Sequence, residues 1–248
     1  MFRYLIEVKY KGTAYGGFQI QENVNTVQAE VEKALSVFFR MPFELTGSSR
    51  TDAGVHALQN YFHFDTEVDF ASGRLQSAVY HINAILPEDI VLLSIISVKD
   101  DFHCRFNALS REYHYHIYRQ KDPFMQDRGY FFPYKLDIEL LDKCAAELMQ
   151  HTHFESFAKK NSQVKTFACT IYRSEWVEVG DSLIYKVEAN RFLRGMVRGL
   201  VGTMLRAGAG KLNIDDFTAI ITGREQSKAD FSVPPQGLFL MHVRYPKG

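Results

Sequence analysis

A short polar segment, residues 48–57, contains the residue types that acid–base or nucleophilic chemistry needs. It reads Ser-Ser-Arg-Thr-Asp-Ala-Gly-Val-His-Ala and lies between two segments that are predicted to be strands. Because Arg50 is close in the sequence, the carboxylate of Asp52 can stay ionised and be aimed by backbone donors, as a nucleophile or a base. The alternative is a hairpin in which Thr51 and Asp52 make only local side-chain to backbone hydrogen bonds.

A second candidate segment, residues 111–118, is predicted to be a strand rich in tyrosine and histidine. Alternation places its side chains on two faces: Tyr113, Tyr115 and Ile117 on one, and His114, His116 and Tyr118 on the other. The two histidines suggest a metal site, but such a site needs three or four ligands, and we find no cysteine or carboxylate spaced to complete it. A tyrosine near the start of the strand could instead stack on a base of single-stranded RNA.

The longest stretch of a single charge sign lies between residues 189 and 214. It carries five basic residues and no acid: Arg191, Arg194, Arg198, Arg206 and Lys211. Residues 191–207 are predicted to form a helix with one apolar face, and the first three arginines fall along the edge of that face. A packing helix with a solvated basic rim is the alternative, but it does not explain why three arginines border the core. We expect an anionic partner to bind here.

The hydrophobic pattern predicts the element order βαββαβ twice. The first copy has strands at 3–10, 43–48, 59–66 and 90–98 and helices at 26–39 and 72–85, with Asn25 and Gln28 arranged as in a capping box. The second copy has strands near 111–119, 169–179, 182–190 and 238–245 and helices near 137–149 and 191–207. This repeat predicts an α+β protein of two tandem ferredoxin-like (split-βαβ) halves, joined near residues 100–110.

Composition narrows the class of protein. The chain has 248 residues, enough for one or two domains, and its 29 basic and 29 acidic residues cancel, which argues against a tail-driven nucleic-acid binder. The longest near-apolar stretch, residues 90–98, is half of what a membrane span needs. Three cysteines at spacings of 40 and 25 residues form no disulfide framework, so we expect a cytoplasmic protein.

Seven segments together resemble, in order along nearly the whole chain, the tRNA pseudouridine synthase A family. They are residues 15–21 (YGGFQIQ), 50–57 (RTDAGVHA), 86–90 (LPEDI), 102–108 (FHCRFNA), 111–115 (REYHY), 192–198 (FLRGMVR) and 235–238 (PQGL). One such match would be weak evidence of kinship, whereas seven in order are very specific.

The resemblance implies a fold and a reaction. The fold would be the pseudouridine synthase fold: two halves with antiparallel sheets, residues 1–105 carrying the Asp52 loop and 106–248 carrying the tyrosine strand and the arginine-rich helix, with an active-site cleft between them. The reaction would be isomerisation of uridine to pseudouridine at positions 38, 39 and 40 of the tRNA anticodon stem-loop. The resemblance also implies that the reaction needs neither cofactor nor metal. It further implies a homodimer whose two subunits share each tRNA.

The resemblance also implies residue roles. Asp52 would be the catalytic carboxylate, Tyr113 would stack against the uracil, and Arg198 would form an ion pair with Asp52. Arg50 would help to extrude the target base and would occupy its place. Arg191 and Arg194 would add tRNA contacts.

This chain departs from the family pattern at two positions. Ser49 stands where the family usually has glycine, and Phe18 where it commonly has tryptophan. If the glycine has a positive φ, Ser49 would strain the turn and change the pose of Arg50.

Two other functions compete with the isomerase. One is a duplicated ferredoxin-like RNA-binding protein without chemistry, which leaves Asp52 without a role. The other is a metal-dependent hydrolase that uses His114 and His116.

Overall fold

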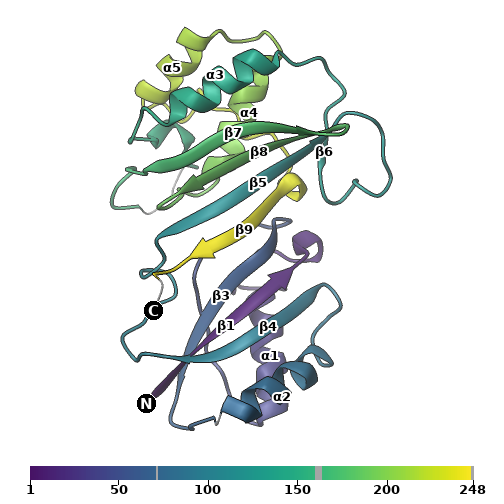
Figure 1. Cartoon of the computed structure of the whole chain (residues 1–248), viewed down its shortest axis with the longest axis vertical. Coiled ribbons are helices and arrows are strands. Elements are labelled where there is room, and N and C mark those ends of the chain that lie inside the picture. The colour runs from purple at the N-terminus through teal and green to yellow at the C-terminus, as the bar shows by residue number, and fades with distance from the viewer. Residues whose placement is uncertain (71, 160–163, 247–248) are drawn as a thin grey trace. The chain divides into compact units, whose positions relative to one another are not determined.

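The computed structural model describes residues 1–70, 72–159 and 164–246. The chain forms two compact units, one of Met1–Leu109 with Leu240–Gly248 and the other of Ser110–Phe239. Each unit combines helices with mainly antiparallel strands (Figure 1). The α+β class predicted from the hydrophobic pattern is confirmed.

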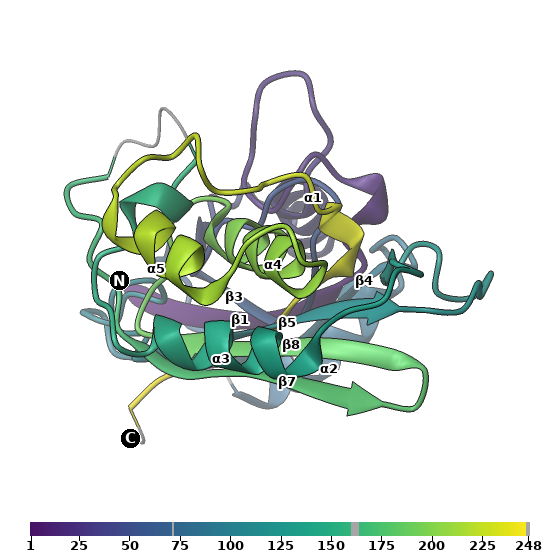
Figure 2. The ribbon, with the colours of Figure 1, turned by 90° about the horizontal axis from the view of Figure 1, so that it is seen from above.

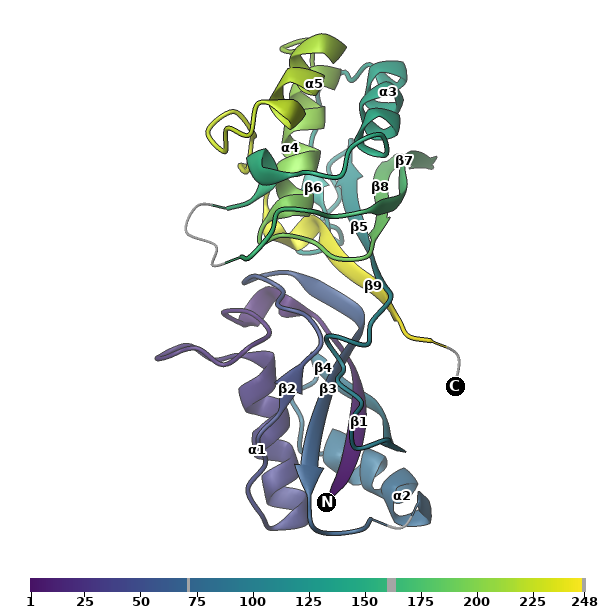
Figure 3. The same cartoon turned by 90° about the vertical axis from the view of Figure 1, so that its left-hand side faces the viewer.

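The first unit follows the predicted order of elements. Its elements are β1 (Phe2–Tyr10), α1 (Val27–Phe39), β2 (Thr46–Gly47), β3 (His56–Thr66), α2 (Ser72–Asn83) and β4 (Ile90–Val98). The strands lie in the order β4-β1-β3, all antiparallel, and β2 pairs with β3. Helix α1 runs along these strands in Figure 3.

Helix α1 is capped differently from the prediction. The N-cap is Thr26, whose hydroxyl accepts a hydrogen bond from the backbone N–H of Ala29, and not Asn25. Gln28 forms no capping box, because its side chain is occupied elsewhere: its amide donates to the carbonyl of Leu45 at 2.7 Å. The predicted box was wrong because a threonine one position later satisfies the free donors of the first turn.

Large apolar side chains fill the core of the first unit. The register pairs Tyr4 with Phe64 and Ile6 with Phe62, which puts these residues on one face of the sheet. Phe62 stacks on Phe18 with a centroid distance of 4.3 Å, and both rings are completely buried. This core lies directly beneath the loop that carries Asp52, since Phe18 also donates its backbone N–H to the carbonyl of Thr51.

The second unit contains the remaining elements. They are β5 (Ser110–Tyr118), β6 (Tyr130–Phe131), α3 (Ile138–Leu148), β7 (Ile171–Val179), β8 (Ser182–Ala189), α4 (Met196–Gly208) and α5 (Ile214–Thr222). Strands β5, β8 and β7 are antiparallel in that order, β6 pairs with β5 in parallel, and the helices lie beside these strands in Figure 2. The final strand β9 (Leu238–Arg244) begins in the second unit and ends in the first.

Two helices of the second unit correct the prediction. Helix α4 begins at Met196, not at residue 191, because Gly195 has φ +73° and cannot continue a right-handed helix. Arg191 and Arg194 therefore lie in the turn before α4, whereas Arg198 and Arg206 belong to the helix. Helix α5 was not predicted, although Asn213 and Asp216 form the capping box that signals its start.

The glycines of α4 allow another segment of the chain to approach the helix closely. A Cβ at Gly202 would lie 2.2 Å from the carbonyl oxygen of Asp230, and one at Gly199 would lie 2.8 Å from the ring of Phe231. Thr203 adds a hydrogen bond, because its hydroxyl accepts from the backbone N–H of Asp230 at 3.0 Å. Asp230 and Phe231, the first residues of segment 230–237, here called the strap, therefore pack directly on the helix backbone.

Among the described residues, no helix has the length and apolar character needed to cross a membrane.

Replacing Gly202 by alanine should destabilise the protein by about 1–3 kcal/mol, because the new methyl group meets a backbone carbonyl. Helix propensity alone predicts the opposite sign, a gain of about 1 kcal/mol. Gly199→Ala should cost less, since the ring of Phe231 can rotate away. Thermal unfolding of both variants tests this ranking, and a Gly202→Ala protein that melts above the wild type would contradict the packing of the strap.

Candidate active site

Asp52 lies at the tip of a turn that connects β2 to β3. The turn closes with a hydrogen bond from the N–H of Val55 to the carbonyl of Asp52, and Gly54 adopts φ +77° to make it possible. Asp52 is half-buried and Arg50 is exposed, whereas Thr51 between them is buried. The carboxylate is thus reachable while its neighbour is fixed in the core.

The segment from Gly12 to Phe18 packs against this turn and hydrogen-bonds to it. Gly12 approaches Val55 so closely that a Cβ there would lie 2.0 Å from the Val55 carbonyl oxygen. Its backbone N–H donates to Nδ1 of His56 at 3.0 Å, and Gly17 forms an isolated antiparallel bridge with Asp52. A larger residue at position 12 would push the turn away from its support.

The two departures from the family pattern are both accommodated. Ser49 is not among the described non-glycine residues with positive φ, so the strain considered for this position does not arise. Its hydroxyl instead donates to Oδ1 of Asn60 at 2.8 Å. Phe18 is buried next to Gly47, where an added Cβ would lie 2.8 Å from the ring.

Tyr113 lies on β5 in the second unit. It pairs with Val187 of β8, is only 8% exposed, and meets the ring of Phe192 edge-on at 5.1 Å. The predicted alternation of this strand is confirmed for its inner face, because Tyr115 and Ile117 are completely buried. The ring of Tyr113 is therefore packed against Phe192 and largely shielded from solvent.

The strap orients the guanidinium of Arg198. Nε donates to the carbonyl of Val233 at 2.8 Å, and Nη2 donates to the carbonyl of Phe231 at 3.2 Å. On the other side, the hydroxyl of Tyr115 donates to the carbonyl of Pro234 at 2.7 Å. These contacts fix the plane of a half-buried arginine in the first turn of α4.

The turn before α4 carries the other two predicted arginines. Arg194 is exposed and Arg191 is half-buried. The carbonyl of Arg194 accepts a hydrogen bond from the N–H of Lys159 at 2.9 Å, which ties this turn to a distant segment. The basic side chains are therefore presented by a fixed turn, although not by a helix.

The chain is similar in sequence to known proteins over nearly its whole length. The family model for tRNA pseudouridine synthase matches residues 6–107 and 145–246. The chain is 41% identical over its whole length to tRNA pseudouridine synthase A of Parabacteroides distasonis, covering 97% of that protein. It is also 41% identical to the protein of the same name from Porphyromonas gingivalis, with 99% and 98% of the two chains covered. The chain belongs to the tRNA pseudouridine synthase family. Pseudouridine synthases are isomerases, and so is this protein.

Two histidines that raised the metal hypothesis have other partners in this pseudouridine synthase. Nε2 of His114 lies 2.9 Å from a carboxylate oxygen of Glu112, and that carboxylate also lies 3.5 Å from Arg173. Glu112 shares the face of His114, but among the described residues these side chains do not form a group of three possible metal ligands. His114 therefore hydrogen-bonds to Glu112, which also pairs with Arg173, and the rings of His114 and His116 are 6.3 Å apart.

One group in the described part of the chain brings three possible metal ligands together: His63, His103 and Cys104, with ligand atoms within 4.8 Å of one another. Its contacts are those of a hydrogen-bonded cluster. Nδ1 of His63 lies 3.1 Å from Sγ of Cys104, and the thiol donates to the carbonyl of Thr46. The N–H of Arg105 donates to Nδ1 of His103, which places the ring proton on Nε2. We therefore assign the cluster to packing.

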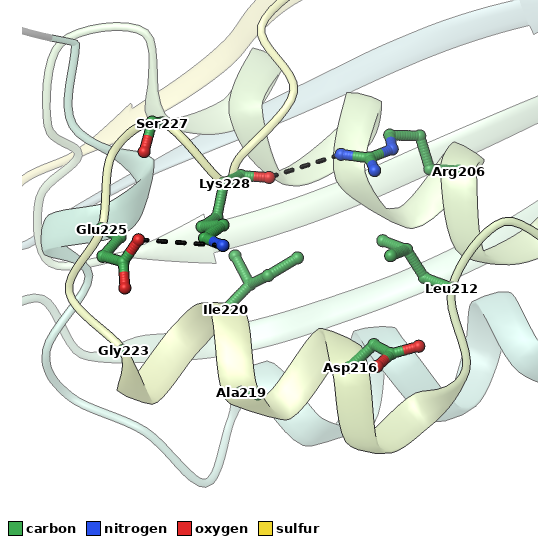
Figure 4. Close-up of a pocket in the computed structure, with 9 residues that line it drawn as sticks. All are labelled: Arg206, Leu212, Asp216, Ala219, Ile220, Gly223, Glu225, Ser227 and Lys228. Carbon is green, nitrogen blue, oxygen red and sulfur yellow. Dashed lines mark hydrogen bonds and ion pairs between the residues drawn. The ribbon is translucent and has the colours of Figure 1, made fainter.

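A pocket of about 530 Å³ in the second unit lies beside α5 (Figure 4). Its charged residues have partners: Arg206 donates to the backbone carbonyl of Lys228 at 3.4 Å, and Nζ of Lys228 lies 3.9 Å from Glu225. Apart from Arg206, none of the basic or catalytic candidates lines it. The pocket therefore has no part in the candidate active site.

Stability should fall as the pH drops from about 6.5 to about 4, partly because of His63. Burial, aided by His103 and Arg3, lowers the pKa of His63 to about 4. In the unfolded chain His63 binds a proton as the pH falls through about 6.5, whereas in the folded chain it does so only near pH 4. Between these values, protonation therefore favours the unfolded state. His63→Asn should flatten the pH dependence of the melting temperature, and the exposed His242→Asn should not. Equal slopes for wild type and His63→Asn would show that His63 is already protonated when folded.

Proposed function

We propose that this protein converts uridine to pseudouridine in tRNA. The N-glycosidic bond is broken, the uracil is rotated, and C5 is joined to the ribose. The observation that carries the proposal is the half-buried Asp52 carboxylate at the tip of a turn that is fastened to the core on both sides. Membership in the family and the names of its relatives support it.

Each candidate residue has one task in this proposal. Asp52 acts on the sugar, either as a nucleophile or as a general base, and Arg198 forms an ion pair with it and keeps it charged. Tyr113 stacks against the uracil. Arg50, exposed beside Asp52, helps to extrude the base and occupies its place.

The substrate and the assembly follow the family resemblance. We propose uridines 38, 39 and 40 of the anticodon stem-loop as targets, in a reaction without metal or cofactor. We further propose a cytoplasmic homodimer with two domains per chain, divided near residue 105. A neutral chain gains a continuous basic groove when two subunits each contribute Arg191 and Arg194.

Asp52→Asn should abolish turnover while tRNA binding survives, because the substitution removes the reactive charge and keeps the shape. The measurement is tritium released to water from tRNA labelled at uracil C5, without added metal or cofactor. Asp101→Asn, an exposed substitution, is the matched control and should behave like the wild type.

Full activity of Asp52→Asn would remove Asp52 from the mechanism. Firm tRNA binding by the wild type without any release would favour the RNA-binding protein that performs no chemistry, or a different RNA substrate.

Arg194→Ala should weaken tRNA binding and lower the slope of log affinity against log salt concentration by about 1, because one phosphate contact is lost. Lys33→Ala, an exposed substitution on α1, provides the control for a change of one charge. Filter binding at several salt concentrations gives both slopes. An unchanged slope for Arg194→Ala would place the tRNA on another surface.

A further inference from the structure

Buried hydroxyl and amide groups meet beneath the Asp52 turn. Asn60 of β3 is completely buried, and its Oδ1 accepts hydrogen bonds from the hydroxyls of Ser48 at 2.7 Å and Ser49 at 2.8 Å. Its amide donates to the hydroxyl of Tyr10 at 3.1 Å. That hydroxyl in turn lies 2.7 Å from the hydroxyl of Thr51. A continuous chain of hydrogen bonds therefore joins residues 48, 49 and 51 through two residues of the sheet.

The turn alternates in burial just before its reactive tip. Ser49 and Thr51 point inward and are 9% and 7% exposed, whereas Arg50 is exposed and Asp52 is half-buried. In an extended segment, fixing the inward side chains also fixes the directions of the outward ones. The two inward hydroxyls belong to the buried network, and the two outward side chains are those with proposed roles on the substrate.

Stability alone does not account for this network. The surrounding core is apolar, with Ile6, Phe18 and Phe62 all completely buried. Burying polar groups among such residues costs free energy unless every group is paired, and the gain over apolar packing is small. A fully paired network instead fixes one arrangement of its side chains. Any other arrangement would leave a buried donor or acceptor without a partner.

We propose that Tyr10 and Asn60 are positioning residues, which orient Asp52 and Arg50 by holding the hydroxyls of Ser49 and Thr51. The proposal rests on the proposed function for the roles of Asp52 and Arg50. Neither positioning residue takes part in the chemistry. Their effect is to prepare the turn before substrate arrives, so that binding energy is not spent on ordering it.

Tyr10→Phe is the most direct test, since it removes one hydroxyl and keeps the ring that stacks on Phe18 at 5.5 Å. We expect kcat to fall about 10-fold or more and KM to change little, because misplacement of a reacting group by about 1 Å can cost about 100-fold. Thr51→Val should have a similar effect, whereas Thr51→Ser, which keeps the hydroxyl, should have nearly wild-type activity. The double variant Tyr10→Phe/Thr51→Val should lose no more than the worse single variant, because both remove the same bond.

Tyr4→Phe is the matched control. It also removes a hydrogen-bonded hydroxyl from β1, where Tyr4 accepts from the N–H of Phe70 at 2.8 Å, far in sequence from the turn. It should lower the melting temperature and leave kcat unchanged. A wild-type kcat in Tyr10→Phe, or an equal loss in Tyr4→Phe, would overturn the positioning role.

Hydrogen exchange provides a readout that does not depend on the reaction. Amides of residues 48–56 should exchange about 10-fold faster or more in Tyr10→Phe than in Tyr4→Phe, since the turn loses its inner attachment. Fast exchange in Tyr10→Phe together with an inactive wild type would reject the proposed reaction and keep the positioning role. Equal exchange in the two variants would reject the positioning role itself.

Discussion

The close contact between Gly12 and Val55 is the constraint on which the Asp52 turn depends. The turn belongs to neither of the strands that flank it, so its position must come from contacts made by its backbone. Because the carbonyl of Val55 leaves no room for a Cβ at residue 12, only glycine lets the two backbones meet there. The bridge from Gly17 to Asp52 and the bond from Phe18 to Thr51 then follow from that approach.

In the second unit, the strap orients the side chain of Arg198. Arginine has a long and flexible side chain, and holding it still costs conformational entropy. The carbonyls of Phe231 and Val233 direct the guanidinium of Arg198, while Gly199 and Gly202 leave room beside the helix for the ring of Phe231 and the backbone of Asp230. In both units, glycine thus allows close packing in the segment that supports a charged side chain, Asp52 in the first and Arg198 in the second.

Local patterns in the sequence predicted most elements, and contacts between distant residues set the rest. Alternation in residues 111–118 and the helical spacing in 137–149 reflect burial of one face, which neighbours in sequence determine. The start of α4 depended on the left-handed Gly195, which periodicity does not register. The motif around Asp52 identified the turn, but its support by Asn60 and Tyr10 joins residues 50 positions apart and leaves no local pattern. Asn60 could have been noticed as a polar residue among the core-facing positions of β3.

The first unit is discontinuous, because it needs residues from both ends of the described chain. Leu109 donates its N–H to the carbonyl of Arg244, and Val243 donates to the side chain of Gln59, 184 positions away. On the ribosome, residues 1–109 emerge early and must wait for β9, with the whole second unit made in between. The strap is also translated after α4, so Arg198 is oriented only near the end of synthesis. A nascent chain therefore carries the Asp52 turn long before the strap that orients Arg198 has been made.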